Sequence, residues 1–248
     1  MRTIPLFTLI WFALANTSTF AATLNGPEIL KKVDSLRNPL ASFQIDVDLV
    51  SYRHQQSETW KMRVFGQGTE KSLVEFVDPA SQKGQYLLML NDAMWIYLPG
   101  TSRPIRISPL QRLMGEASNG DVARTNYSID YNAELAGEEA VDNLLCHRLE
   151  LTAKDAAKDA AVSYSKVTLW VSKSNYEPVK ADFYVVSGKL MKHAFFREFG
   201  VLNGNRAITA IEIHDAIRPG RRTVMRYSKL QPKELPEKMF NKNYLGKW

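Results

Sequence analysis

Apolar and polar side chains alternate with a period of two residues along much of this chain. Ile45, Val47 and Leu49, for example, alternate with polar neighbours. Runs of this kind cover residues 44–49, 60–64, 74–76, 145–151, 166–171, 179–185 and 207–214. Such alternation is typical of antiparallel strands that bury one face, and turn-forming residues separate the runs. The pattern predicts about eleven strands, which must curl into a barrel or split into packed sheets.

A helical spacing precedes the first of these runs. Asn25 and Glu28 form a start signal, with Pro27 close to the first helical position. Apolar residues then follow at intervals of three and four residues, until Pro39 stops the pattern. We therefore expect an amphipathic helix over residues 28–36.

A second helical pattern interrupts the predicted strands near the middle of the chain. Ser108 is a good helix cap, and the apolar residues up to position 114 share one helical face before Gly115. A further short helix is expected around residues 121–124. The sequence thus predicts a helical insertion within the sheet.

The N-terminus has the pattern of an export signal. Arg2 precedes an apolar run over residues 4–14, and small residues follow up to Ala22. The run is too short to span a bilayer, which requires about 20 apolar residues. The pattern matches a cleavable secretory signal. We therefore expect a signal peptide at residues 1–21, one mature domain at residues 22–248, and a periplasmic location.

Composition and charge narrow the classes of function. The chain has 248 residues, of which 45% are hydrophobic and 23% are charged, as in ordinary soluble globular proteins. The formal net charge is +6 at pH 7, but the basic residues are spread out. Together with export, this argues against a nucleic-acid partner. Arg218, Arg221 and Arg222 form a small basic group for which an anionic headgroup, a membrane surface and plain solvation all remain open.

The sequence contains no motif for metal binding or catalysis. Its four histidines are far apart, and neither a His-x-x-x-His nor a Cys-x-x-Cys pair occurs. Cys146 alternates with apolar positions and is typical of an inert thiol. Asp46 and Asp48 share a predicted strand face with Gln44, which indicates a solvated surface. We therefore expect no catalytic residue, no metal and no cofactor, and a protein that is not an enzyme.

An apolar cavity is the remaining candidate for a functional site. A strongly curved sheet of about eleven strands has a concave face larger than one or two short helices can fill. The chain has eight methionines, Met1 included, and methionine suits adaptable apolar pockets. An ordinary packed core is the alternative interpretation of the same residues.

Several segments are similar to a known family. The most distinctive are residues 94–99 (MWIYLP) and 103–107 (RPIRI). Further similar segments are residues 78–79, 83–87, 137, 146–151, 176–180, 187–190, 235–236 and 240. Together they resemble the LolA-like family of outer-membrane lipoprotein-sorting proteins, which are relatives of the periplasmic lipoprotein carrier LolA. The resemblance covers nearly the whole mature chain.

The resemblance implies an incompletely closed antiparallel barrel, with short helices closing its mouth and an apolar cavity that holds acyl chains. It also implies an inner-membrane transporter and an outer-membrane acceptor as partners. Residues 115–121 (GEASNGD) depart from the glycine-serine-aspartate-aromatic stretch that is usual in this branch. The carrier's lid-gating arginine has no assignable counterpart among the matching segments.

These patterns together give a mainly β, α+β fold: a single curved, incompletely closed antiparallel β-barrel with short helices as a lid. The candidate cavity-lining residues, taken from apolar strand faces, are Trp60, Met62, Val64, Val74, Phe76, Val167, Leu169, Phe183 and Ile211. The candidate lid residues are Ile29, Leu30, Val33, Leu110, Leu113 and Met114.

Two functional hypotheses follow from this reading. The leading hypothesis is a monomeric periplasmic carrier or chaperone that binds lipid or lipoprotein acyl chains and shuttles them within the cell envelope. The alternative is a periplasmic sensing or scaffold domain that docks a membrane protein without transporting cargo.

Overall fold

The computed structural model describes residues 24–124, 126–154 and 162–247, so the predicted signal peptide lies outside the described residues. The helices are α1 (Gly26–Arg37), α2 (Asn119–Ala123) and α3 (Tyr127–Asp130), with short 3₁₀ helices η1 (Glu237–Phe240) and η2 (Lys242–Tyr244). The strands are β1 (Ser42–Arg53), β2 (Gln56–Gln67), β3 (Lys71–Asp78), β4 (Tyr86–Leu90), β5 (Ala93–Tyr97), β6 (Ile105–Ile107), β7 (Arg112–Met114), β8 (Ala117–Ser118), β9 (Tyr131–Val141), β10 (Leu144–Ala153), β11 (Lys166–Ser172), β12 (Pro178–Tyr184), β13 (Leu190–Leu202), β14 (Asn205–Asp215) and β15 (Arg221–Pro232).

One large antiparallel sheet dominates the described part of the chain. It has 13 strands in the order β6-β5-β4-β3-β2-β1-β15-β14-β13-β12-β11-β10-β9. The first strand, β1, pairs with the last, β15, so that Val50 lies opposite Val224 in the middle of the sheet. One arm runs from β2 to β6 and the other from β14 to β9. Strands β6 and β9 are the two edges of the sheet, which is therefore not closed.

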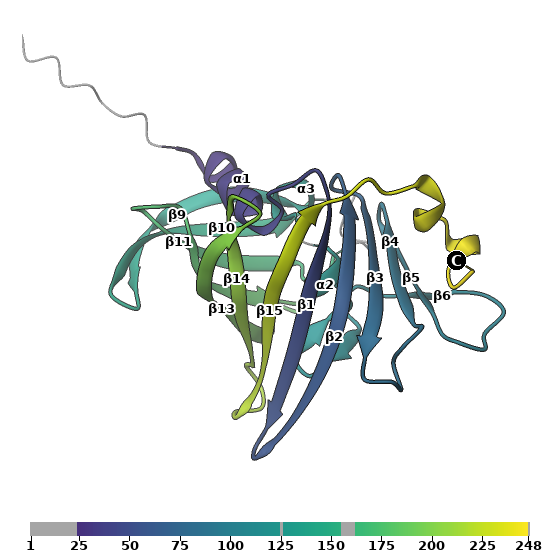
Figure 1. Cartoon of the computed structure of the whole chain (residues 1–248). Coiled ribbons are helices and arrows are strands. Elements are labelled where there is room, and N and C mark those ends of the chain that lie inside the picture. Colours follow the sequence, from purple (N-terminus) through teal and green to yellow (C-terminus); the bar gives the residue numbers. More distant parts are fainter. Residues whose placement is uncertain (1–23, 125, 155–161, 248) are drawn as a thin grey trace, which may run out of the picture.

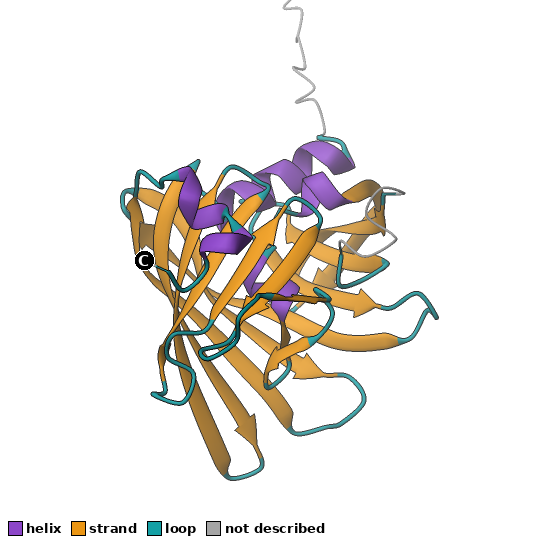
Figure 2. Ribbon diagram, turned by 90° about the vertical axis from the view of Figure 1, so that its right-hand side faces the viewer, coloured by secondary structure: helices purple, strands orange, loops and turns teal. Residues whose placement is uncertain are grey.

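The sheet twists strongly across its width, as antiparallel sheets do. In Figure 1 strands β1 to β3 run upright, whereas β9 and β11, on the left, run across the picture. Figure 2 shows the helix α1 at the top of the molecule and a short helix within the space that the sheet surrounds. The predicted class, mainly β with an open antiparallel sheet and a few short helices, is confirmed.

The predicted first helix is confirmed as α1. Asn25 Oδ1 accepts a hydrogen bond from the Glu28 amide (3.0 Å), and the Glu28 carboxylate accepts one from the Asn25 amide (2.9 Å). This reciprocal capping box satisfies two amides at the helix start. Ile29, Leu30 and Val33 are buried on one face, and they pack α1 against the sheet.

The predicted helix at residues 108–114 is wrong. Residues 108–111 form a single turn, and β7 and β8 then form a hairpin around Gly115. Gly115 has φ of +57°, and a Cβ at this position would lie 2.3 Å from Thr223 Oγ1 on β15. The hairpin must fit closely against β15. For this reason Leu110 lies in a turn, and Leu113 and Met114 lie on a strand, although their spacing is helical.

The second short helix predicted in this region is confirmed as α2, although it begins at Asn119. The described residues contain fifteen strands, where the alternation predicts about eleven. Strands β6, β7 and β8 have three, three and two residues. Such short strands contain too few positions to show an alternation.

Both faces of the β2–β4 region are buried. Val64, Val74 and Leu87 face the large core on the helix side of the sheet. The opposite faces of these strands carry a second cluster, in which the C-terminal segment packs on the sheet. Its buried members are Phe65, Leu73, Leu88, Leu235, Phe240 and Leu245. The C-terminal segment thus covers the outer face and leaves the inner face to the helices.

Candidate functional site

The inner face of the sheet and the helices enclose one continuous apolar core. Eight of the nine candidate cavity-lining residues lie in it with at most 6% of their surface exposed: Met62, Val64, Val74, Phe76, Val167, Leu169, Phe183 and Ile211. Trp60 is partly buried at the margin of this core, with its ring 5.9 Å from that of Phe76. The structure therefore brings the selected residues together, and their contact with a ligand stays a prediction.

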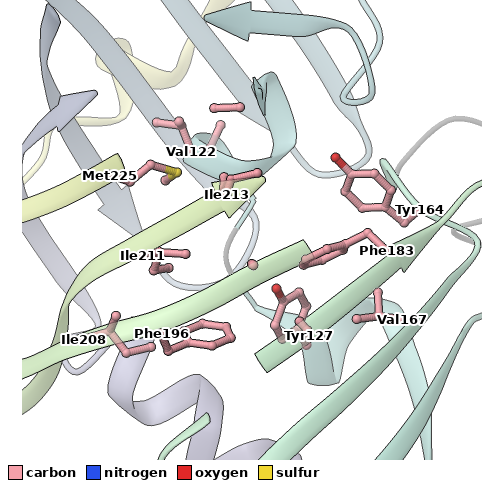
Figure 3. Packing of buried hydrophobic residues seen from close by; sticks show 14 of the residues in the cluster. Val122, Tyr127, Tyr164, Val167, Phe183, Phe196, Ile208, Ile211, Ile213 and Met225 are labelled. Atoms are coloured by element: carbon pink, nitrogen blue, oxygen red, sulfur yellow. The ribbon is translucent and has the colours of Figure 1, made fainter. Parts of the chain in front are cut away.

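Figure 3 shows how side chains from both the sheet and the helices contribute to this core. Tyr127, from α3, lies near Val167 and Phe183 of the strands, and Val122, from α2, lies on the side of Met225 and Ile213. The short helices therefore fill space that the sheet alone would leave open.

The candidate lid residues separate into two groups. Ile29, Leu30 and Val33 are at most 1% exposed on the inner face of α1. Of the other three, Met114 is buried in the same core and Leu113 is partly buried against it, but both lie on strand β7. Leu110 is 41% exposed and lies outside the core. Of the two candidate lid segments, the first is therefore a helix that covers the core, whereas residues 110–114 belong to a turn and a strand.

Helix α1 is held to the rest of the molecule by a buried carboxylate. The Asp34 carboxylate accepts hydrogen bonds from the amides of Tyr127 (2.8 Å) and Ser128 (2.7 Å) at the start of α3. Burial raises the pKa of Asp34, although these hydrogen bonds oppose the shift. At the other end of α1, a Cβ on Gly26 would lie 2.7 Å from the Ala133 carbonyl oxygen of β9.

Arg37 occupies the junction between α1 and the interior. Its guanidinium carbon lies 4.6 Å from the centre of the Tyr127 ring. Its side chain lines three separate cavities, of about 40, 30 and 20 Å³. Tyr127 lines one of them and Tyr227 lines the other two, and burial raises the pKa of both hydroxyls. A charged group therefore lies next to neutral phenols at the place where these cavities approach one another.

The cavities near α1 are small in this closed arrangement. A cavity needs about 10–15 Å³ to hold one water molecule, so the three spaces around Arg37 hold a few water molecules at most. The core is close-packed rather than hollow. Binding of a long apolar chain therefore requires that α1 or the short helices move.

Neither Asp34 nor Arg37 was selected from the sequence. Asp34 lies four positions after Leu30 and Arg37 lies four positions after Val33, so helical spacing places them on or beside the buried face of α1. Charged residues at such positions are unusual, because burial of a charge requires partners. That spacing was the signal that could have identified them.

The described residues lack two features that are typical of other classes of function. They contain no group of three or more His, Cys, Asp or Glu side chains that could hold a metal ion. No helix within the described ranges is long and apolar enough to cross a membrane.

An open antiparallel sheet with a helix closing an apolar core defines a class of folds, and comparison with known proteins gives the family. A family model described as an uncharacterized protein matches residues 68–247. The solved structure of a LolA superfamily protein from Nitrosomonas europaea is 38% identical and has a TM-score of 0.82, with 90% of this chain and 100% of that chain covered. This chain belongs to the LolA superfamily.

Two further solved structures are similar over most of the chain. A DUF1329 family protein from Desulfovibrio piger is 26% identical with a TM-score of 0.76, and 89% of this chain and 97% of that chain are covered. A putative outer membrane lipoprotein-sorting protein domain from Vibrio parahaemolyticus is 23% identical with a TM-score of 0.74, covering 89% and 98%. The similarity to the Vibrio parahaemolyticus domain shows a shared fold. No curated protein matches the chain.

Proposed function

We propose that this protein is a periplasmic carrier or chaperone that binds the acyl chains of a lipid or lipoprotein in its interior and shuttles them within the cell envelope. The observation that supports the proposal is the apolar core beneath α1, which the helix covers with Ile29, Leu30 and Val33. The proposal involves no cofactor and no catalytic step.

Binding requires an exchange of apolar contacts. An acyl chain gains about 0.8 kcal/mol for each buried methylene group, so a chain can replace the contacts that α1 makes with the sheet. Methionines at the core, including Met62, Met89 and Met225, can adopt new rotamers around such a chain. The hydrogen bonds between Asp34 and the start of α3 would hold α1 in place, and their loss would release it.

The route of transport is part of the same proposal. The signal peptide at residues 1–21 directs export, and residues 22–248 form the mature domain, which acts as a monomer. An inner-membrane transporter delivers the cargo and an outer-membrane acceptor receives it. Membership of the LolA superfamily and the lipoprotein-sorting likeness support this assignment.

The direct test is native mass spectrometry of the mature protein, purified from a periplasm without detergent, followed by extraction with organic solvent. A lipid or acylated cargo near one molecule per chain would support the proposal. An empty protein that also fails to take up a fluorescent fatty acid would contradict it.

A matched pair of variants localises the cargo. Phe76 is 1% exposed on the inner face of β3, and its neighbour Val77 is 38% exposed on the other face. Phe76→Asp should abolish uptake of a fluorescent fatty acid, whereas Val77→Asp should keep it. Unchanged uptake by a folded Phe76→Asp protein would exclude this part of the core as the binding site.

The second candidate function is a periplasmic sensing or scaffold domain that docks a membrane protein without cargo. The small size of the cavities around Arg37 favours it, because a packed core needs no ligand. It predicts that the purified protein contains no stoichiometric lipid, so the same extraction experiment separates the two functions.

A further inference from the structure

A cavity larger than those around Arg37 lies away from α1, between the β7–β8 hairpin, the start of β13 and the β14–β15 turn. The β14–β15 turn is at the bottom of Figure 1. We call this cavity the base pocket. Its volume is about 100 Å³. Leu110 and Ile217 line it and are 41% and 45% exposed, so the pocket has an accessible apolar margin.

A buried carboxylate forms the floor of the base pocket. The Glu116 side chain is only 7% exposed, and among the described residues its Oε1 atom has no hydrogen-bond partner. The Glu116 amide donates to Thr223 Oγ1 at 2.8 Å, and the close packing of Gly115 fixes the hairpin at this point. The floor therefore holds a firmly positioned carboxylate, which lines the pocket.

A second carboxylate lies beside the first. Asp215 Oδ1 accepts hydrogen bonds from the amides of Ile217 (2.8 Å) and Arg218 (2.9 Å). Burial and the neighbouring Asp215 charge raise the pKa of Glu116. Two adjacent carboxylates, one of them with an unpartnered oxygen, favour a ligand that brings a positive charge and several hydrogen-bond donors.

Two arginines provide the opposite charge at the margin. Arg218 Nη2 lies 3.9 Å from Glu116 Oε2, and Arg218 Nε lies 2.7 Å from Asp215 Oδ2. Arg112 is exposed on β7, lines the same pocket and interacts electrostatically with Glu116. Deeper in the wall, Lys192 is paired with Asp121. The pocket is therefore nearly neutral overall, with negative charge at its floor and positive charge at its margin.

We propose that the base pocket binds a phosphoethanolamine group. The primary ammonium, with three donors, would contact the Glu116 carboxylate beside Asp215, and the phosphate would lie between Arg112 and Arg218. Leu110 and Ile217 would contact the carbon atoms attached to the phosphate.

This ligand class fits both the charge and the size of the pocket. A zwitterion leaves the net charge of the site unchanged, while each of its charges meets the opposite sign. A simple anion would face the carboxylates, and a simple amine would leave the arginine margin without an anion. Because one water molecule needs about 10–15 Å³, a cavity of about 100 Å³ has room for the four-atom chain of an ethanolamine group.

The inference goes beyond the carrier function, because it assigns a polar group to a site outside the apolar core. It is therefore tested with a probe that has no acyl chain. Isothermal titration of the mature protein with sn-glycero-3-phosphoethanolamine should give saturable binding. Glycerol 3-phosphate, ethanolamine and sn-glycero-3-phosphocholine should each bind at least tenfold more weakly. Absence of saturable binding, or equal affinity for all four compounds, would overturn the proposal.

Two variants test the two halves of the site. Glu116→Gln should weaken binding of the phosphoethanolamine probe at least tenfold through loss of the ammonium contact, and Arg112→Gln should do so through loss of the phosphate contact. Glu70→Gln and Arg103→Gln change exposed residues outside the pocket and should leave the affinity unchanged. Wild-type affinity in folded Glu116→Gln and Arg112→Gln proteins would overturn the assignment.

A measurement on the wild-type protein removes dependence on the folding of variants. The methyl NMR signals of Met191 and Ile217, which line the pocket, should shift when the soluble probe is added, and that of Met62 should not. Shifts confined to the core methyl groups would contradict the proposed site.

Further measurements identify the source of the group and separate this inference from the carrier function. Sedimentation with vesicles of phosphatidylethanolamine, compared with vesicles of phosphatidylcholine, distinguishes a lipid headgroup from a free phosphoethanolamine compound. Uptake of a fluorescent fatty acid tests the apolar core independently. Probe binding without fatty-acid uptake would support the base pocket and contradict the carrier function. Fatty-acid uptake without probe binding would support the carrier function and contradict the base pocket.

Discussion

The two ends of the inner space differ in chemistry. Beneath α1, apolar side chains fill the interior, and the cavities around Arg37 are about 40 Å³ or smaller. At the base, a pocket of about 100 Å³ has carboxylates at its floor and arginines at its margin. The first end can change only if packed elements move, whereas the second has space in the closed structure. The same sheet therefore borders a close-packed apolar region and a polar pocket.

The largest expected effect comes from the packed region. Phe76→Ala removes a side chain that is 1% exposed, and such a substitution lowers the free energy of unfolding by about 3–5 kcal/mol. Phe195→Ala, at a partly exposed ring on the outer side of β13, should cost clearly less. Urea denaturation of both variants measures the difference. Similar losses would show that the inner face is not the more tightly packed one.

The next largest effect is expected from a substitution that tests how tightly the β7–β8 hairpin packs against β15 beneath the base pocket. Gly115→Ala places a methyl group 2.3 Å from Thr223 Oγ1 at a φ of +57°. Gly68→Ala is the control, because Gly68 has φ of +59° but nothing within 4 Å of a Cβ. Both variants incur about 1–2 kcal/mol for the backbone conformation, and overpacking at Gly115 should add about 1–3 kcal/mol. Equal melting temperatures would contradict the close contact.

A smaller effect is expected where α1 is attached. Asp34→Ala leaves the buried amide of Tyr127 and the partly buried amide of Ser128 without their acceptor, which costs about 1–3 kcal/mol. Lys31→Ala, on the exposed side of the same helix, is the control. Hydrogen exchange should become faster in α1 of the Asp34→Ala protein than in the control. If protection is the same in both, Asp34 does not hold the lid.

The smallest effect concerns pH at the base. Burial and the Asp215 charge raise the pKa of Glu116 from its ordinary value of 4.5, so the folded protein holds this proton more tightly than the unfolded chain. The free energy of unfolding should therefore fall as the pH rises from about 4.5 through the raised pKa. Glu116→Gln should remove this part of the pH dependence. Identical pH profiles by urea denaturation would contradict it.

The sequence pattern predicts the long strands and the first helix well, but it predicts the irregular segment in the middle of the chain poorly. Strand β1 alternates between buried and partly buried residues along most of its length, and α1 has both a capping box and an apolar face. The helix predicted at residues 108–114 is wrong. Leu110, Leu113 and Met114 have helical spacing, but packing of Gly115 against Thr223 favours a hairpin. Contacts between distant segments of the chain override local spacing there.

The candidate site was predicted in part for a similar reason. Apolar positions on strand faces identify core residues such as Val74 and Leu169, although Leu73 and Trp170 on the opposite faces are buried as well. Polar residues of the interior depend on tertiary neighbours. Asp34 is explained only by the start of α3, 93 residues away, and Glu116 only by the β14–β15 turn. Helical spacing places Asp34 on the buried side of α1, but no local pattern identifies the distant partner of Asp34 or of Glu116.

The pairing of β1 with β15 has a consequence for how the chain folds. Each arm of the sheet is a meander of neighbouring strands, which can form through local hairpins, but Val50 and Val224 meet only after nearly the whole chain is available. Contacts of such long sequence separation make folding slow. Until β15 arrives, β1 is an unpaired edge open to strands of other chains. We therefore expect the seam between β1 and β15 to close last, and the risk of aggregation to be greatest before it closes.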